Sequence, residues 1–154
     1  MAVDVLTERV IRRPRAEVAA FAGDPTNAPR WYANIRSVTW QTEPPVRLGS
    51  RVAFVAFFLG RRLEYTYEVV ELAPLERLVM RTAQGPFPME TTYTWEDASE
   101  GTRMTLRNRG EPSGFARAVA PLMAAMMRRA DDADLATLAR ALEGDGGERG
   151  APTR

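Results

Sequence analysis

The fold is decided by residues 51–72, RVAFVAFFLGRRLEYTYEVVEL, in which an apolar run and an alternating run flank the pair Gly60-Arg61. A two-residue turn at this pair predicts an antiparallel hairpin that places Phe58 opposite Leu63. Successive side chains of a strand point to opposite faces, and a slip by one residue would mix those faces. We therefore expect a well-specified hairpin with one apolar and aromatic face, formed by Val52, Phe54, Ala56, Phe58, Leu63, Tyr65, Tyr67 and Val69.

Similar patterns on both sides of this hairpin predict a meander of strands with one apolar side. Two short helices, residues 15–21 and 25–31, would join the first two strands, since Pro14 suits a first helical turn. The other expected strands are residues 3–11, 35–42, 77–82 and 89–95, and a last strand after a turn at residues 99–101. On the apolar side we place Met89, Thr91, Tyr93 and Trp95 of one strand and Met104, Leu106 and Asn108 of the next.

The period then changes to that of a long amphipathic helix, residues 113–143. Its apolar stripe predicts that the helix covers the apolar side of the sheet, and we expect Pro121, on the opposite side, to bend the helix without ending it. Residues 1–143 are predicted to form a single domain, and residues 144–154, rich in glycine and charge, a disordered tail. The stripe contains Ala116, Val119, Ala120, Met123, Met126, Met127, Ala130, Leu138 and Ala141.

The composition excludes much of the usual catalytic chemistry. The chain has no histidine, no cysteine and no lysine, so all 21 basic residues are arginines. It therefore lacks a side chain that titrates near neutrality without perturbation, a thiolate nucleophile and a Schiff-base amine. With neither His nor Cys, a transition-metal site is not expected, and we predict no metal and no cofactor.

Charge and hydropathy also limit the partners. A net charge of +1 argues against a nucleic-acid partner, because binding of phosphates requires a concentrated positive field. No apolar run approaches the ~20 residues that span a bilayer, and the start of the chain lacks a basic signal region. We accordingly predict a cytoplasmic protein with no integral membrane association; the sequence does not determine its oligomeric state.

Several short segments occur in the order that a known superfamily shows. They are Pro14-Arg15-Ala16-Glu17-Val18, Asp24-Pro25, Arg30-Trp31-Tyr32, Gly49, Tyr67-Glu68-Val69, Leu72-Ala73-Pro74, Tyr93-Thr94-Trp95, Gly101-Thr102-Arg103-Met104-Thr105 and Asp134-Leu135-Ala136-Thr137-Leu138. With these segments the chain resembles the START-like, or SRPBCC, superfamily, and within it the polyketide cyclase/dehydrase and lipid-transport group. The resemblance implies an α+β helix-grip fold, in which a seven-stranded antiparallel sheet curls round the C-terminal helix and encloses a cavity for an apolar small molecule.

The candidate ligand-binding residues are the large or polar side chains of this predicted apolar surface. Each has an alternative role in filling the core, but several tyrosines on one concave surface favour a cavity, because a buried phenol needs a hydrogen-bond partner. Flexible methionines suit a wall that adapts to an apolar guest. The candidates are Trp31, Tyr32, Phe54, Phe58, Tyr65, Tyr67, Met89, Thr91, Tyr93, Trp95, Asn108, Met123, Met126 and Met127.

Asp134 falls near the apolar stripe of the helix, where an ionised carboxylate needs a partner or a raised pKa. One interpretation is structural, a carboxylate bonded to an arginine, a tyrosine or loop backbone that fixes the helix on the sheet. The other is general-base catalysis.

Two functions follow from these candidates. The first is non-catalytic binding of a lipid- or polyketide-like molecule, which needs no catalytic group. The second is a cyclase/dehydrase that promotes intramolecular aldol closure and dehydration, with Tyr65, Tyr67, Tyr93 and Asp134 as candidate catalytic residues. Aromatic cyclases of the group place an arginine in the pocket, and the predicted inner face has none, which favours binding.

Overall fold

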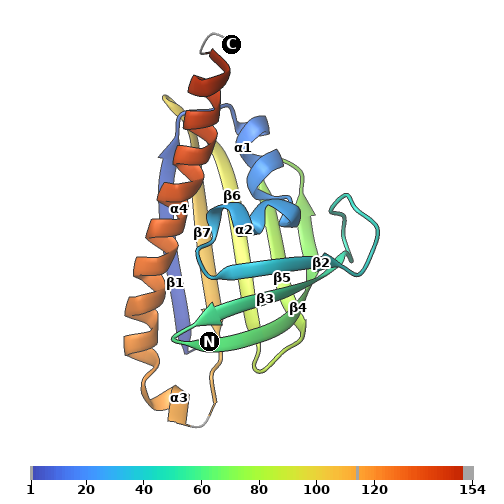
Figure 1. Cartoon of the computed structure of the whole chain (residues 1–154), viewed down its shortest axis with the longest axis vertical. Helices are drawn as coiled ribbons and strands as arrows, with labels where there is room; N and C mark the ends of the chain where they lie inside the picture. The colour runs from blue at the N-terminus through green and yellow to red at the C-terminus, as the bar shows by residue number, and fades with distance from the viewer. Residues whose placement is uncertain (1, 114, 151–154) are drawn as a thin grey trace.

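Seven antiparallel strands form one sheet in the computed structural model, which describes residues 2–113 and 115–150 (Figure 1). In spatial order the strands run β1-β7-β6-β5-β4-β3-β2, so the two strands at the N-terminal end of the chain form the two edges. The predicted α+β helix-grip architecture is confirmed. The strands are β1 (Val3–Ile11), β2 (Ile35–Trp40), β3 (Arg51–Phe58), β4 (Arg61–Ala73), β5 (Arg77–Gln84), β6 (Met89–Ala98) and β7 (Gly101–Gly110).

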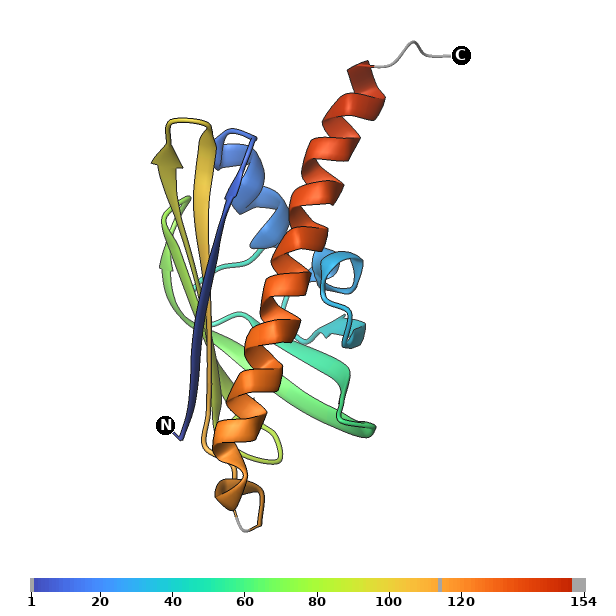
Figure 2. The same ribbon diagram turned by 90° about the vertical axis from the view of Figure 1, so that its left-hand side faces the viewer.

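Three short helical segments carry the chain from β1 to β2. They are α1 (Arg15–Ala22), the 3₁₀ turn η1 (Pro25–Asn27) and α2 (Ala28–Trp31). Pro14 precedes α1 with extended backbone, and the side chain of Asp24 accepts a hydrogen bond from the Thr26 N–H to cap η1. These segments lie on the same side of the sheet as the long helix (Figure 2).

The β3–β4 hairpin forms, but with its turn one residue earlier than expected. Phe58 pairs with Arg61, where the sequence predicts Leu63, because the turn residues are Leu59 and Gly60. Both have positive φ, 55° and 76°, as a two-residue type I′ turn requires. The predicted pairing was wrong by two residues, and a shift of two leaves every side chain on its predicted face.

The C-terminal helical region is broken at Val119, where the sequence predicts only a bend at Pro121. A short α3 (Phe115–Ala118) precedes α4 (Ala120–Gly150), and Pro121 stands in the first turn of α4. A proline has no N–H to donate to the preceding turn and is tolerated at the start of a helix, which explains a new helix at this point. Helical backbone also continues past Glu143 to Gly150, where the sequence predicts a disordered tail. The remaining residues of the predicted tail, 151–154, lie outside the described residues.

The core lies between the sheet, α1, α2 and the C-terminal half of α4. Helix α4 runs along β1 and covers the concave side of the sheet (Figures 1 and 2). Leu135 and Leu138 of α4 pack in one buried cluster with strand residues such as Leu78, Met104 and Leu106. The N-terminal half of α4 makes a smaller cluster with β1, and the space that the sheet curvature leaves between the two clusters forms the site described next.

Candidate ligand-binding site

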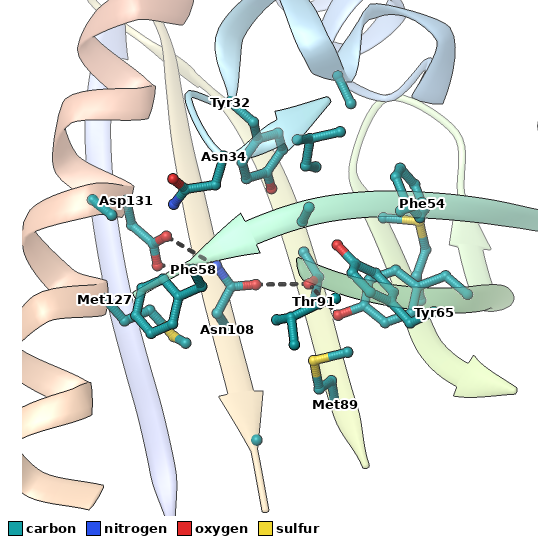
Figure 3. A pocket seen from close by; sticks show the side chains of 18 of the residues that line it. Tyr32, Asn34, Phe54, Phe58, Tyr65, Met89, Thr91, Asn108, Met127 and Asp131 are labelled. Carbon is teal, nitrogen blue, oxygen red and sulfur yellow. Dashed lines mark hydrogen bonds between the residues drawn. The ribbon is translucent and has the colours of Figure 1, made fainter. Parts of the chain in front are cut away.

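A cavity of about 150 Å³ lies between the concave face of the sheet, the middle of α4 and the segment that joins α2 to β2 (Figure 3). Apolar and aromatic side chains make up most of its wall. Twelve residues that the sequence predicts, eleven for ligand binding and one as a catalytic candidate, line this cavity: Tyr32, Phe54, Phe58, Tyr65, Tyr67, Met89, Thr91, Tyr93, Asn108, Met123, Met127 and Asp134.

Three predicted ligand-binding residues lie elsewhere. Trp31 is only 1% exposed and fills the core beneath Tyr32 and Tyr93, with ring centroids 4.1 Å and 5.8 Å away. Trp95 is buried in the same core, 5.9 Å from the Tyr93 ring, and borders a different hollow. Met126 is 40% exposed, since neighbouring helix positions differ by about 100° and, of the two adjacent methionines, only Met127 faces the cavity.

A second and larger hollow, about 390 Å³, lies beyond Trp95, between α1 and the β2–β3 loop. Its polar side chains serve the local fold: Asp24 accepts from the Thr26 N–H, and the Thr26 hydroxyl accepts from the Trp40 indole N–H at 2.9 Å. The first cavity is the stronger candidate despite its smaller volume, because it holds buried titratable groups and an extended polar network.

The β3–β4 hairpin supplies an aromatic wall. Phe54 and Tyr65 are opposite each other in the β3–β4 register and stack with ring centroids 5.4 Å apart. Tyr67 meets Tyr65 edge to face at 5.0 Å. Burial raises the pKa of Tyr67 to about 12 and that of Tyr65 well above its ordinary value, so both phenols are neutral at physiological pH.

A second pair of phenols closes the cavity under α2. The hydroxyl oxygens of Tyr32 and Tyr93 are 2.7 Å apart, so one donates a hydrogen bond to the other. Burial raises the pKa of both groups well above the ordinary tyrosine range. Because one of the two protons is used within the pair, the other remains available to a guest.

A row of four polar side chains crosses the floor of the cavity from β4 to α4. The Tyr67 hydroxyl is 2.9 Å from the Thr91 hydroxyl, and the Thr91 hydroxyl donates to the Asn108 Oδ1 at 2.6 Å. The Asn108 Nδ2 in turn donates to the Asp131 carboxylate at 3.0 and 3.1 Å (Figure 3). Thr91 and Asn108, both predicted ligand-binding residues, are therefore linked to each other within the wall of the cavity.

Two carboxylates one helical turn apart face this cavity from α4. Asp131 is 4% exposed and Asp134 is 3% exposed. Burial raises the pKa of Asp131 to about 7, against the hydrogen bond from Asn108, and raises that of Asp134 to about 6. Asp134 accepts a hydrogen bond from the Ala33 N–H at 3.1 Å, which ties α4 to the loop after α2. This contact is of the type that the structural interpretation of Asp134 predicts, a carboxylate bonded to loop backbone. A catalytic role of Asp134 remains a proposal.

Sequence reasoning missed Asp131, although a signal for it exists. Asp131 follows Met127 by four residues and precedes Asp134 by three, so all three share one helix face. Asn34, in the loop after α2, also lines the cavity and carried no such periodic signal.

One arginine, Arg109, borders the cavity. Its guanidinium is held by Glu90 at 3.0 Å and lies 3.8 Å from Asp4, so it is engaged in ion pairs. Among the side chains that the structure describes, those of residues 2–113 and 116–144, no cluster of three or more acidic residues is arranged to hold a metal ion. Among the described helices, none combines the length and apolar content that a membrane-spanning segment requires.

Comparison with known proteins agrees with this architecture. A sequence model of the family described as "Polyketide cyclase / dehydrase and lipid transport" matches residues 2–143. The protein TTHA0849 of Thermus thermophilus has a similar structure, with TM-score 0.80, 21% identity and coverage of 92% of this chain and 98% of that one. No curated protein matches the sequence.

Two further solved structures have a similar fold, an aromatase/cyclase and a START superfamily protein. The Zhui aromatase/cyclase of Streptomyces sp. R1128 aligns with TM-score 0.74 and 16% identity, over 91% of this chain and 93% of the other. A START superfamily protein of Mycobacterium smegmatis aligns with TM-score 0.67 and 16% identity, over 92% and 95% of the two chains. At these identities the likeness shows the fold.

Proposed function

Since this chain belongs to the polyketide cyclase/dehydrase and lipid transport family, we propose that it binds an apolar small molecule, lipid- or polyketide-like, in the cavity between the sheet and α4. The observation that carries the proposal is the aromatic cavity itself, about 150 Å³. An apolar cavity of about this volume is large enough to hold a benzene ring. Transfer of apolar surface from water supplies the affinity, ~25 cal/mol per Å² before the costs of ordering.

Filling the cavity should abolish binding. In Met127→Trp the indole would occupy space in the cavity that Met127 lines, and we expect the affinity for toluene, followed by NMR titration, to fall at least about tenfold. Met126→Trp is the matched control, because Met126 lies one position away and is exposed. Equal affinities of the two variants for toluene, or no binding by the unmodified protein, would contradict the proposal. Native mass spectrometry of freshly purified protein would test for a guest acquired in the cell.

A cyclase/dehydrase is the second candidate, and the buried carboxylates favour it. A group with a pKa near 7, such as Asp131, is suited to accept a proton at neutral pH. In an aldol closure it would remove a proton next to a carbonyl, while a phenol of the Tyr32 and Tyr93 pair donates a hydrogen bond to the oxygen that gains charge.

For this second candidate we expect Asp131→Asn and Tyr93→Phe to slow cyclisation of a poly-β-ketone at least about tenfold in kcat. Their affinity for toluene should stay within about twofold, because neither change fills the cavity. Thr137→Ala is the control and should leave the rate unchanged, because Thr137 is half-buried on α4 and is not part of the cavity wall. Unchanged kcat in both test variants would defeat the catalytic candidate and leave the binding proposal intact.

A further inference from the structure

The hydrogen bonds of the polar row Tyr67-Thr91-Asn108-Asp131 all run in one donor-to-acceptor direction. This direction follows from the chemistry of Asp131, the last member of the row. An ionised carboxylate only accepts hydrogen bonds, so Asn108 must turn its Nδ2 toward Asp131. The opposite orientation of the amide would place its oxygen against the carboxylate oxygens, two acceptors in contact. The Asn108 Oδ1 then faces Thr91 and accepts its hydroxyl proton at 2.6 Å.

The direction passes along the row to Tyr67. A hydroxyl has one proton, and that of Thr91 is committed to Asn108, so Thr91 can only accept from Tyr67. The Tyr67 proton is therefore committed to Thr91, across the 2.9 Å between their oxygens. Toward a guest in the cavity, the Tyr67 oxygen presents lone pairs only.

We infer, on the basis of the proposed function, that the position next to the Tyr67 oxygen in this cavity takes a hydrogen-bond donor of the guest, a neutral hydroxyl group on an aromatic or apolar body. The hydroxyl would donate to the Tyr67 oxygen and complete a row of hydrogen bonds that ends at Asp131. Each bond of such a row polarises the next, so the Tyr67 oxygen is a stronger acceptor than an isolated phenol.

The same arrangement discriminates against ethers and ketones at this position. An ether oxygen next to Tyr67 would bring two sets of lone pairs together in a site shielded from water, and neither oxygen could accept a hydrogen bond from the other. A site built to pair with a hydroxyl rejects an analogue that lacks it, because its own buried polar group is then left unpaired.

Tyr65 is a second phenol of the same wall, and it differs from Tyr67 in its hydrogen bonding. Its hydroxyl makes no hydrogen bond within the described residues, and it stands two positions from Tyr67 on the same face of β4. Its proton is free to serve a guest that accepts, so Tyr65 belongs to the aromatic wall without belonging to the directed row.

The experiment measures the dissociation constants of four small probes at pH 8.5, above the pKa of about 7 to which burial raises Asp131. Phenol and toluene have nearly the same shape, as do anisole and ethylbenzene, so each oxygen probe is compared with its own apolar partner. For the unmodified protein we expect phenol to bind about fivefold more tightly than toluene, the gain from one buried hydrogen bond. Any hydrogen bond to anisole would come from Tyr65 or from the Tyr32–Tyr93 pair, so its affinity relative to ethylbenzene should be the same in the unmodified protein and in Tyr67→Phe.

Two variants and one control locate the effect. Tyr67→Phe removes the acceptor and should reduce the phenol advantage to less than about twofold. Thr91→Val frees the Tyr67 proton while it preserves side-chain shape, and should raise the affinity for anisole relative to the unmodified protein. Met126→Leu, at an exposed position of α4 outside the cavity wall, is the control and should retain the phenol advantage. Binding of phenol and toluene with equal affinity by the unmodified protein would overturn the inference alone, as would an advantage that survives Tyr67→Phe. Failure of all four probes to bind would overturn the proposed function and the inference with it.

Discussion

Replacing Asp131 by Asn should raise the free energy of unfolding at pH 8 by about 2–4 kcal/mol. The wild-type carboxylate is ionised at this pH in a site that is 4% exposed, and burial has raised its pKa from 3.8 to about 7. Each unit of such a shift corresponds to about 1.4 kcal/mol of cost for the charged form in the folded state. An asparagine side chain removes the charge, and its oxygen still accepts one of the two hydrogen bonds that Asn108 donates to Asp131.

The stability gain from Asp131→Asn should depend on pH, because the wild-type carboxyl is charged only at higher pH. Between about pH 4 and pH 7 the folded protein binds a proton at Asp131 that the unfolded chain has released, so wild-type stability falls as pH rises through this window. Below about pH 4 both states are protonated and the cost is absent. The advantage of Asp131→Asn should therefore be below about 1 kcal/mol at pH 4.5 and should reach its full size above pH 7.

Urea denaturation at pH 4.5 and pH 8 measures both numbers. Asp132→Asn is the matched control, because Asp132 is the exposed neighbour of Asp131 on the same helix and its substitution should change stability by less than about 0.5 kcal/mol. An Asp131→Asn variant that is no more stable than wild type at pH 8, or whose advantage grows toward low pH, would contradict the assignment of a buried charge.

Gly101→Ala should destabilise the protein by more than about 3 kcal/mol, a fall in Tm of roughly 10 °C. Gly101 begins β7 with φ +149°, a conformation that residues with a side chain rarely adopt. A Cβ there would overlap the carbonyl oxygen of Ile11 and lie 2.9 Å from the Cα of Arg12 and from the nitrogen of Arg13. These are backbone atoms at the end of β1, so no side-chain rotation relieves the overlap.

Gly60→Ala distinguishes the two causes of the expected loss of stability in Gly101→Ala, the positive φ and the overlap of the added Cβ with neighbouring backbone. Gly60 also has positive φ, +76°, but a Cβ there would have open space around it. Its substitution should cost about 1–2 kcal/mol, from backbone conformation alone. Thermal unfolding of the two variants side by side gives the comparison. Similar losses of stability in both would show that the close approach of β7 to the end of β1 contributes little.

The sequence was sufficient for the faces of the strands and insufficient for their exact partners. Alternation in β4 and β6 identifies which side chains point inward, since this depends only on the period of a strand. The register of the hairpin depends on the turn, and no preference in the sequence favours Leu59 at positive φ over a turn that begins with Gly60. The break at Val119 has a similar cause, because a proline in helical sequence is compatible with a bend and with a new start.

The sequence likewise predicted part of the candidate site, the direction of the wall residues, but not the contacts between distant elements. Aromatic residues on the apolar face predicted much of the wall, because packing and lining require the same inward direction. The pairing of Asn108 with Asp131 joins a strand to a helix 23 residues later, and its existence depends on how far α4 is displaced along the sheet. No local pattern encodes that displacement, so Asp131 was missed although its position on the helix was predictable.

The order of the strands also has a consequence for how the chain reaches its native state. Strand β1 emerges first during synthesis, yet its partner in the sheet is β7, with Val3 opposite Gly110 and Ile11 opposite Thr102. The helix that covers β1 emerges later still. Throughout the synthesis of β2 to β6, β1 has neither neighbour, and its pairing closes a loop of roughly 100 residues. Folding of this domain is therefore expected to be slow, and an N-terminal fragment that lacks β7 and α4 would expose β1 as an aggregation-prone edge.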